Sequence, residues 1–335
     1  MLSRRLLRIK VIKELYAHLK SESDSLTASL KELKASVDKT YDLYHLVLHL
    51  VADVAGYAEE RIELARNKKL PTTEDLNPNR RFVDNALVAQ IAQSRALNDY
   101  LKKHKLSWAA SPELIKTLYN DLAASDFYAK YMSASTVAVD GERASRRAAQ
   151  ALAVPSPAPV TYRDDVRLVE EFYMQIVAES DQAEEVLEEQ SILWADDLDF
   201  ATIMALRTIA ACKVGQEDIP LLPQFKNDDD RRFAKELFTA ALTGYDEYLT
   251  YVERFAQNWD VERIALLDCL IMVIAIAEMV TFPSIPVKVT LDEYIEISKY
   301  YSTPGSSVFI NGILDKVVEE LRATGRMEKT GRGLL

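Results

Sequence analysis

The first part of the chain has the apolar spacing of an amphipathic helix. Between Arg4 and Lys20, large aliphatic side chains recur every four positions: Leu7, Val11, Leu15 and Leu19. Ile12 and Tyr16 widen this apolar face. Since residues at i and i+4 lie on one side of an α-helix, the pattern predicts a helix over 4–20.

A second, longer helix is predicted after the polar break at 21–25. From Leu26 to Ala58, the apolar residues alternate steps of four and three, which is typical of a long helix with one packed seam. We expect this helix to end near Gly56 or soon after.

The middle of the chain has a different organisation. Prolines and turn-forming residues between Lys68 and Arg80 end the first helical part. We then expect helical segments at 81–104, 112–131, 162–189 and 197–213. The stretch 133–160 is rich in alanine, serine and proline and reads as a surface linker, with room for a short helix inside it. Pro220 and Pro223 close this middle region.

The last hundred residues predict a helical bundle. Helices are expected at 229–243, 245–257, 260–281, 290–301 and 305–323. Thr290 and Glu293 have the spacing of an N-terminal capping box, and Pro304-Gly305 separates the final pair. The run 264–280 is apolar almost all round, which indicates a buried central helix. No segment has the alternation of a β-strand, so we predict an all-α fold.

Composition limits the function classes. The chain has 335 residues, of which 48% are hydrophobic and 28% charged, as in a folded globular protein with more than one helical unit. The net charge of −11 argues against nucleic-acid binding through overall charge, so any such site must be local. With Cys212 and Cys269 alone, neither a disulfide framework nor a structural zinc site is indicated. No export signal or membrane-spanning run is apparent, and we expect a cytoplasmic protein without membrane contact.

Two C-terminal stretches carry a specific resemblance. They are Pro286-Val-Lys-Val-Thr-Leu-Asp-Glu-Tyr-Ile-Glu-Ile-Ser-Lys299 and Phe309-Ile-Asn-Gly-Ile-Leu-Asp315. In order and spacing they resemble the signature of the NusB family, close to P-x-K-V-A-I-N-E-A-I-E-L-A-K followed by F-V-N-G-V-L-D. The stretch 270–279 and the basic start of the chain, with Leu15-Tyr16, are similar to further helices of that family.

The resemblance implies an organisation and a function. Residues 1–66 and 226–322 would form a NusB-like helical bundle, with 67–225 a helical insertion and 323–335 a flexible tail. NusB proteins are all-helical and non-enzymatic, bind the boxA sequence of nascent RNA, and pair with NusE, a small-subunit ribosomal protein, to suppress premature termination. The expected partners are therefore single-stranded boxA-like RNA, NusE and the transcription elongation complex.

The same resemblance assigns site residues by position. The expected RNA-binding residues are Arg4, Arg5, Arg8, Lys10, Lys288, Phe309 and Asn311. The expected NusE-binding residues are Tyr16 and Asp268. Val273 stands where the family usually has arginine, and Val308 where a basic residue often precedes the phenylalanine.

The chemistry of these residues leaves alternatives. Residues 1–13 hold five basic side chains and no acid, which suits phosphate binding but also suits a solvated helix face. Phe309 could stack on a base or lie in the core. Asn311 could bind a base or a neighbouring helix end. Asp268 interrupts an apolar helix, so it is either a partner-facing acid or a buried, hydrogen-bonded carboxylate.

Metal binding and catalysis find little support. His45 and His49 have the i, i+4 spacing of a shared metal, but no third ligand is apparent, and we predict neither a metal nor a cofactor. No glycine-rich nucleotide-binding motif or alternation of strands and helices occurs, so no enzyme is predicted. The alternative function is a helical scaffold for protein interactions with weak or no RNA binding, in which the insertion binds another protein.

Overall fold

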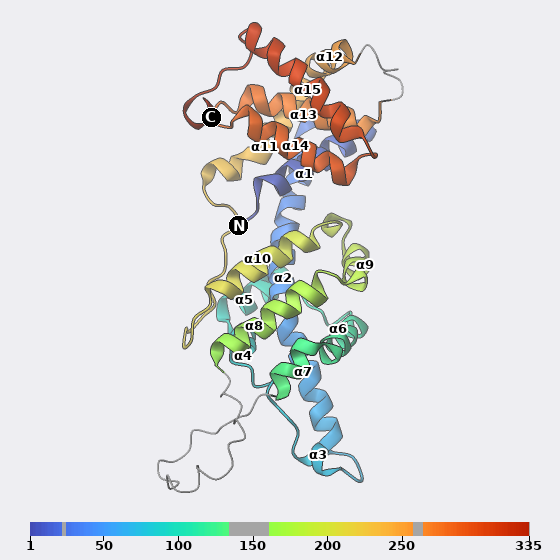
Figure 1. The fold of residues 1–335 in the computed structure, drawn as a ribbon, viewed down its shortest axis with the longest axis vertical. Coiled ribbons are helices and arrows are strands. Elements are labelled where there is room, and N and C mark those ends of the chain that lie inside the picture. Colours follow the sequence, from blue (N-terminus) through green and yellow to red (C-terminus); the bar gives the residue numbers. More distant parts are fainter. Residues whose placement is uncertain (22–24, 134–160, 257–263, 335) are drawn as a thin grey trace, which may run out of the picture. The chain divides into compact units, whose positions relative to one another are not determined.

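The computed structural model describes residues 1–21, 25–133, 161–256 and 264–334, and all regular elements within these residues are helical (Figure 1). The predicted all-α fold is confirmed. The chain forms two compact units, each described by itself below. Unit 1 comprises Met1–Asp38 and Gln224–Leu335, and unit 2 comprises Lys39–Pro223. From residue 134 on, the predicted linker lies outside the described residues.

Unit 1 contains both ends of the chain. Its helices are α1 (Arg4–Lys20), the start of α2 (Leu26–Arg66), α11 (Asp228–Thr243), α12 (Tyr245–Phe255), α13 (Leu266–Thr281), α14 (Val287–Tyr301), α15 (Ser306–Ala323) and a final 3-10 turn (Gly331–Leu334). Helix α13 contacts α1, α11, α12, α14 and α15, and its residues 270–279 are fully buried. It is the central helix of this unit, as its uniformly apolar sequence predicts.

Helix α14 begins earlier than predicted. Its N-cap is Pro286 and its first residue is Val287, so Thr290 lies inside the helix. The Thr290 hydroxyl donates a hydrogen bond to Glu278 of α13 at 2.8 Å instead of capping the helix. The predicted capping box at Thr290 and Glu293 is therefore wrong, because both side chains are engaged by other helices.

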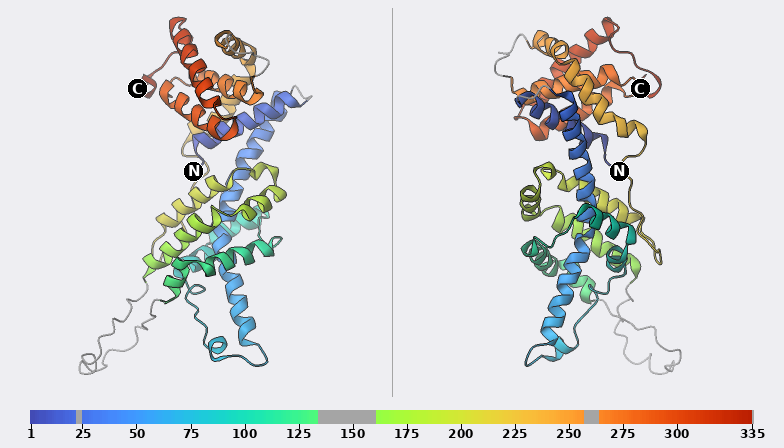
Figure 2. Two further views of the ribbon diagram at one scale, coloured as in Figure 1. Left: turned by 45° about the vertical axis from the view of Figure 1, so that its right-hand side comes forward. Right: turned by 180° about the vertical axis from the view of Figure 1, so that it is seen from behind.

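Unit 2 is built around the second part of α2. Its other elements are α3 (Thr73–Leu76), α4 (Ala86–Gln93), α5 (Arg95–His104), α6 (Pro112–Ala124), α7 (Asp126–Ser133), α8 (Tyr162–Phe172), a π-helical turn (Tyr173–Val177), α9 (Asp181–Gln190), a 3-10 turn (Ile192–Trp194) and α10 (Leu198–Ala211). In both views of Figure 2, green and yellow helices of this unit lie beside α2 in blue.

Buried polar groups fix these helices on α2. The indole N–H of Trp108 donates to the carbonyl of Leu46 at 2.9 Å, and the Tyr173 hydroxyl donates to the carbonyl of Val47 at 2.7 Å. Helix α2 continues past Gly56 to Arg66, so its predicted end is wrong. A single glycine costs a helix only about 1 kcal/mol, which the packing on both sides of Gly56 outweighs.

Serine residues divide several predicted helices. The predicted helix at 81–104 is two helices, because the Ser94 hydroxyl accepts from the backbone N–H of Leu97 and starts α5. Ser125 and Ser180 accept in the same way at the starts of α7 and α9. Serine favours such N-cap positions, since its oxygen satisfies an otherwise unpaired N–H.

The observed unit boundaries differ from the expected domain limits. The division falls after Asp38 rather than after residue 66, because the apolar side chains of α2 beyond this point are buried within unit 2. The described part of the expected flexible tail is packed on unit 1. Met327 is buried, and the N–H of Thr330 donates to the carbonyl of Pro283 at 3.0 Å.

Glu14 of α1 gives unit 1 a pH-dependent stability. Partial burial raises the pKa of Glu14 from 4.5 to about 7; a hydrogen bond from Ser29 opposes the shift and the charge of Glu32 adds to it. A carboxyl whose pKa is raised on folding contributes stability below pH 4.5, and this contribution is lost as the pH rises through 7.

We therefore expect Glu14→Gln to match the unmodified chain in stability near pH 4.5. Near pH 8 it should be more stable by about 1 kcal/mol, a figure reduced for solvent screening of a half-exposed group. Urea denaturation across this pH range measures the difference. Parallel stability curves for the two proteins would contradict the expectation.

Candidate nucleic-acid interface

The first turn of α1 presents two arginines at the surface of unit 1. Ser3 caps the helix, with its hydroxyl accepting from the N–H of Leu6 at 3.2 Å. The apolar face buries Leu7 and Val11 in the unit. The Arg4 and Arg5 side chains are left 34% and 43% exposed. The sequence thus turns one face of a basic helix inward and leaves guanidinium groups at its N-terminal end.

Arg4 and Arg5 each contact a carboxylate from a distant part of the chain. The Arg4 Nε lies 2.7 Å from Oδ1 of Asp230, in the first turn of α11. Arg5 makes two hydrogen bonds to Glu293 of α14, at 2.8 and 3.1 Å. The hydrogen bond to Glu293 raises the pKa of Arg5 above its ordinary value. Both pairs are open to solvent in part.

Arg8 occupies a different environment. Its Nε and Nη2 each donate to Glu278 at 2.7 Å, and the two side chains are 3% and 0% exposed. Glu278 also accepts from the hydroxyls of Thr290 and Tyr294. Burial alone lowers the pKa of Arg8, but the bond and charge of Glu278 outweigh it and raise the pKa above the ordinary value. In this structure Arg8 ties α1 to α13 and α14, and it is not accessible to a ligand.

Lys10 is also buried. Its exposed fraction is 2%, and it takes part in an interaction within the protein. Of the four basic residues expected on the first helix, the structure therefore brings Arg4 and Arg5 to the surface and encloses Arg8 and Lys10. The sequence contains one basic cluster, whereas the fold divides it into an outer and an inner pair.

Lys288 and Asn311 lie together on another side of α14. They line a cleft of about 720 Å³ between α14, α15 and the C-terminal segment. Lys288 is exposed, and the Asn311 amide donates to Asp315 at 3.3 Å. Phe309, in the first turn of α15, is half-buried and is not among the residues that line the cleft. The C-terminal candidates thus form a second group, and α14 carries residues of both groups.

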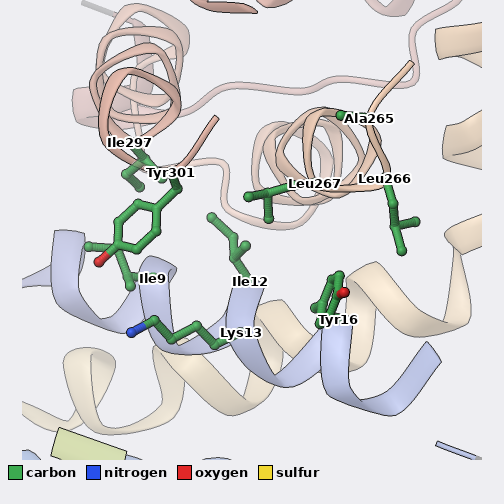
Figure 3. Close-up of a pocket in the computed structure, with 9 residues that line it drawn as sticks. All are labelled: Ile9, Ile12, Lys13, Tyr16, Ala265, Leu266, Leu267, Ile297 and Tyr301. Carbon is green, nitrogen blue, oxygen red and sulfur yellow. The ribbon is translucent and has the colours of Figure 1, made fainter. Parts of the chain in front are cut away.

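Tyr16 lines an apolar groove between α1 and the helices α13 and α14. The groove has a volume of about 510 Å³, and Figure 3 shows Ile12 and Tyr16 of α1 pointing toward the helix that carries Leu267. Its lining residues are Ile9, Ile12, Lys13, Tyr16, Ala265, Leu266, Leu267, Ile297 and Tyr301. The surface is mainly aliphatic, with the phenol groups of Tyr16 and Tyr301 and the ammonium group of Lys13 as its polar parts.

Asp268 follows the lining residues of this groove in sequence but points into the protein. It is 5% exposed, and its two oxygens accept from the hydroxyls of Ser302 and Ser306, the latter at 2.7 Å. This is the second alternative of the sequence analysis, a buried carboxylate satisfied by hydrogen bonds. In this structure Asp268 joins the start of α13 to the turn between α14 and α15, and its carboxylate is buried.

His45 and His49 do not share a site. His45 hydrogen-bonds the carbonyl of Tyr41 at 2.8 Å and stacks on Tyr100, whereas His49 pairs with Asp53 at 2.7 Å. Among the described residues, no group of three potential ligands is arranged to hold a metal ion. In the same part of the chain, no helix is both long enough and apolar enough to cross a membrane.

Sequence reasoning missed the three carboxylates that hold the arginines. For Glu278 a signal existed, since a charged residue in a uniformly apolar helix needs a buried partner of opposite charge. Asp230 and Glu293 gave no such signal, because acidic residues are ordinary on the polar faces of soluble helices.

Known proteins are similar in sequence to the part of this chain that contains most of these residues. The sequence model of the NusB family matches residues 201–319, so the match begins in α10 and ends in α15. A transcription antitermination protein NusB from Salinibacter ruber is 40% identical over 114 residues, 34% of this chain and 71% of the relative. Those of Natranaerobius thermophilus and Chloroherpeton thalassium are 34% and 40% identical, covering 32% and 31% of this chain and 79% and 49% of the relatives. No solved structure shows a significant match to this chain.

The fold and the site define an all-helical bundle protein with a basic helix end at its surface and an apolar groove beside it. Two relatives at 40% and 34% identity, of which the chain covers 71% and 79%, show the family of this bundle. The chain belongs to the NusB family.

Proposed function

We propose that this protein is a transcription antitermination factor that binds boxA-type single-stranded RNA together with NusE. It works without catalysis, in the cytoplasm, as part of the transcription elongation complex. The names of the relatives support the antitermination role. In this proposal unit 1 is the NusB-like part, and most of 67–225 is an insertion.

The observation that carries the RNA-binding proposal is the first turn of α1. Two half-exposed guanidinium groups, Arg4 and Arg5, lie where the helix dipole itself attracts anions. At physiological salt, charges beyond about 8 Å are largely screened, so a phosphate docked here responds to these groups rather than to the net charge. Lys288, Asn311 and Phe309 are proposed to extend the RNA contacts along α14 and α15.

The groove beside Tyr16 is the proposed contact for NusE. Its aliphatic walls suit an apolar segment of a protein partner, with the phenol groups giving direction through hydrogen bonds. For Asp268 we propose an indirect role, in which the carboxylate holds the start of α13 and so the wall formed by Leu266 and Leu267.

The test is a double variant with both surface arginines replaced, Arg4→Gln and Arg5→Gln. We expect boxA-like RNA to bind on the order of tenfold more weakly, because two phosphate contacts are lost. The slope of log affinity against log salt should fall by about 1.4, at about 0.7 for each contact with a single strand. Fluorescence anisotropy with labelled RNA at several salt concentrations measures both quantities.

The matched control replaces Arg254 and Arg326. These arginines are also in unit 1, each side chain is 50% exposed, and each is paired with a glutamate. Their double replacement changes the net charge equally, so it should leave the salt slope nearly unchanged. Equal slopes for the two double variants would contradict RNA binding at α1 and favour the alternative, a helical scaffold whose insertion binds another protein.

A further inference from the structure

Both surface arginines of the proposed RNA face already hold an anion supplied by the chain itself. Glu293 approaches Arg5 with both carboxylate oxygens, one on Nε at 2.8 Å and one on Nη2 at 3.1 Å. Asp230 contacts the Nε of Arg4 at 2.7 Å. Paired oxygens on the edge of a guanidinium group are also the arrangement by which arginine binds a phosphate.

The position of these pairs on α1 makes them replaceable by an external anion. The first turn of α1 contains two arginines and no acidic residue. The two positive charges therefore lie at the positive end of the helix dipole, where they are repelled. Asp230 and Glu293 neutralise this excess of positive charge from α11 and α14. Any other anion that reaches the same place gains from the same field.

Exposure separates the pairs that can exchange from the one that cannot. The side chains of Arg5 and Glu293 are 43% and 23% exposed, so solvent and ligands reach this pair. Arg8 and Glu278 are almost fully enclosed and hold α1 in position. Glu293 also lies 3.6 Å from Nη1 of Arg8, so it keeps a cationic neighbour after losing Arg5.

We propose that Asp230 and Glu293 are intrachain competitors of the RNA phosphates for Arg4 and Arg5. Binding then exchanges two internal ion pairs for two arginine–phosphate contacts, and the two carboxylates set the affinity of the face for RNA. Only a ligand whose phosphates bind better than these carboxylates occupies the site. This inference rests on the RNA-binding function proposed above.

The experiment removes the competing charge without removing the arginines. Glu293→Gln and Asp230→Asn keep the side-chain size and abolish the negative charge. Since an exposed ion pair contributes up to about 1 kcal/mol, each variant should bind boxA-like RNA about two- to fivefold more tightly than the unmodified chain. Binding should be tightest for the double variant. Anisotropy titration of the full chain at a single salt concentration measures these changes.

Glu253→Gln is the matched control. Glu253 lies in α12, is exposed, and lines neither the cleft beside Lys288 nor the groove beside Tyr16. The substitution changes the net charge by the same amount, so its effect on RNA affinity measures the general charge contribution. We expect it to change the affinity less than twofold.

The outcomes separate this inference from the proposed function. If the unmodified chain binds RNA and neither Glu293→Gln nor Asp230→Asn binds more tightly than Glu253→Gln, the competition is disproved and the RNA-binding function stands. If neither the unmodified chain nor the double variant binds, both proposals fail. Thermal melting checks each fold, and if Glu293→Gln does not fold, the comparison of Asp230→Asn with Glu253→Gln decides.

Discussion

Replacing Glu278 with glutamine is expected to lower the free energy of unfolding of unit 1 by about 3–5 kcal/mol, the cost of leaving a buried charge without its partner. The Arg8 guanidinium is 3% exposed and donates two hydrogen bonds to this carboxylate. Glutamine retains the size of the side chain but removes the charge. The buried Arg8 charge then loses its closest carboxylate and keeps Glu293, 3.6 Å from its Nη1, as a more distant one.

Hydrogen exchange measured by peptide on the full chain localises the effect. Amides of α13 and α14 should lose protection, whereas those of α2 beyond Lys39, in unit 2, serve as an internal reference. A second variant, Arg8→Met with Glu278→Gln, removes both charges and should recover part of the lost stability, because no charge is buried unpaired and the glutamine oxygen still accepts from Thr290 and Tyr294. Unchanged protection in Glu278→Gln would show that the ion pair does not hold α1 on the bundle.

Reversing the charge of Asp268 is the second large effect that we expect. Asp268→Lys places an ammonium group in a site that is 5% exposed and removes the acceptor for the Ser302 and Ser306 hydroxyls. We expect unit 1 to lose about 3 kcal/mol or more, and Asp268→Asn to cost about 1 kcal/mol, since the amide still accepts a hydrogen bond.

A comparison with Tyr16→Ala separates a structural role from a binding role. Tyr16 is 43% exposed in the groove, so its removal should leave hydrogen exchange in α13 almost unchanged. Asp268→Lys should instead raise exchange at the start of α13 and in the turn before α15. If Asp268→Lys keeps full protection and only weakens binding of NusE, the carboxylate contacts the partner directly.

Local sequence patterns were sufficient to predict the positions of most helices. The helix predicted over 4–20 spans Arg4–Lys20, because apolar spacing and a serine cap are properties of adjacent residues. The buried central helix followed from its uniformly apolar composition. The breaks at Ser94 and Ser125 were missed, since an apolar pattern continues across a serine that starts a new helix. The start of α14 was misjudged because Thr290 forms its hydrogen bond with another helix.

For the candidate site, the sequence alone supplied the residue types and the family, but not which side chains face outward. It contained a basic first helix and the two C-terminal motifs, and these were enough to indicate the NusB family. Whether an arginine binds a ligand or the protein itself depends on carboxylates distant in sequence: Asp230 is 226 residues from Arg4, and Glu278 is 270 residues from Arg8. Only the tertiary structure brings these charges together, because ion pairing depends on distance in space and burial, which helical periodicity does not encode.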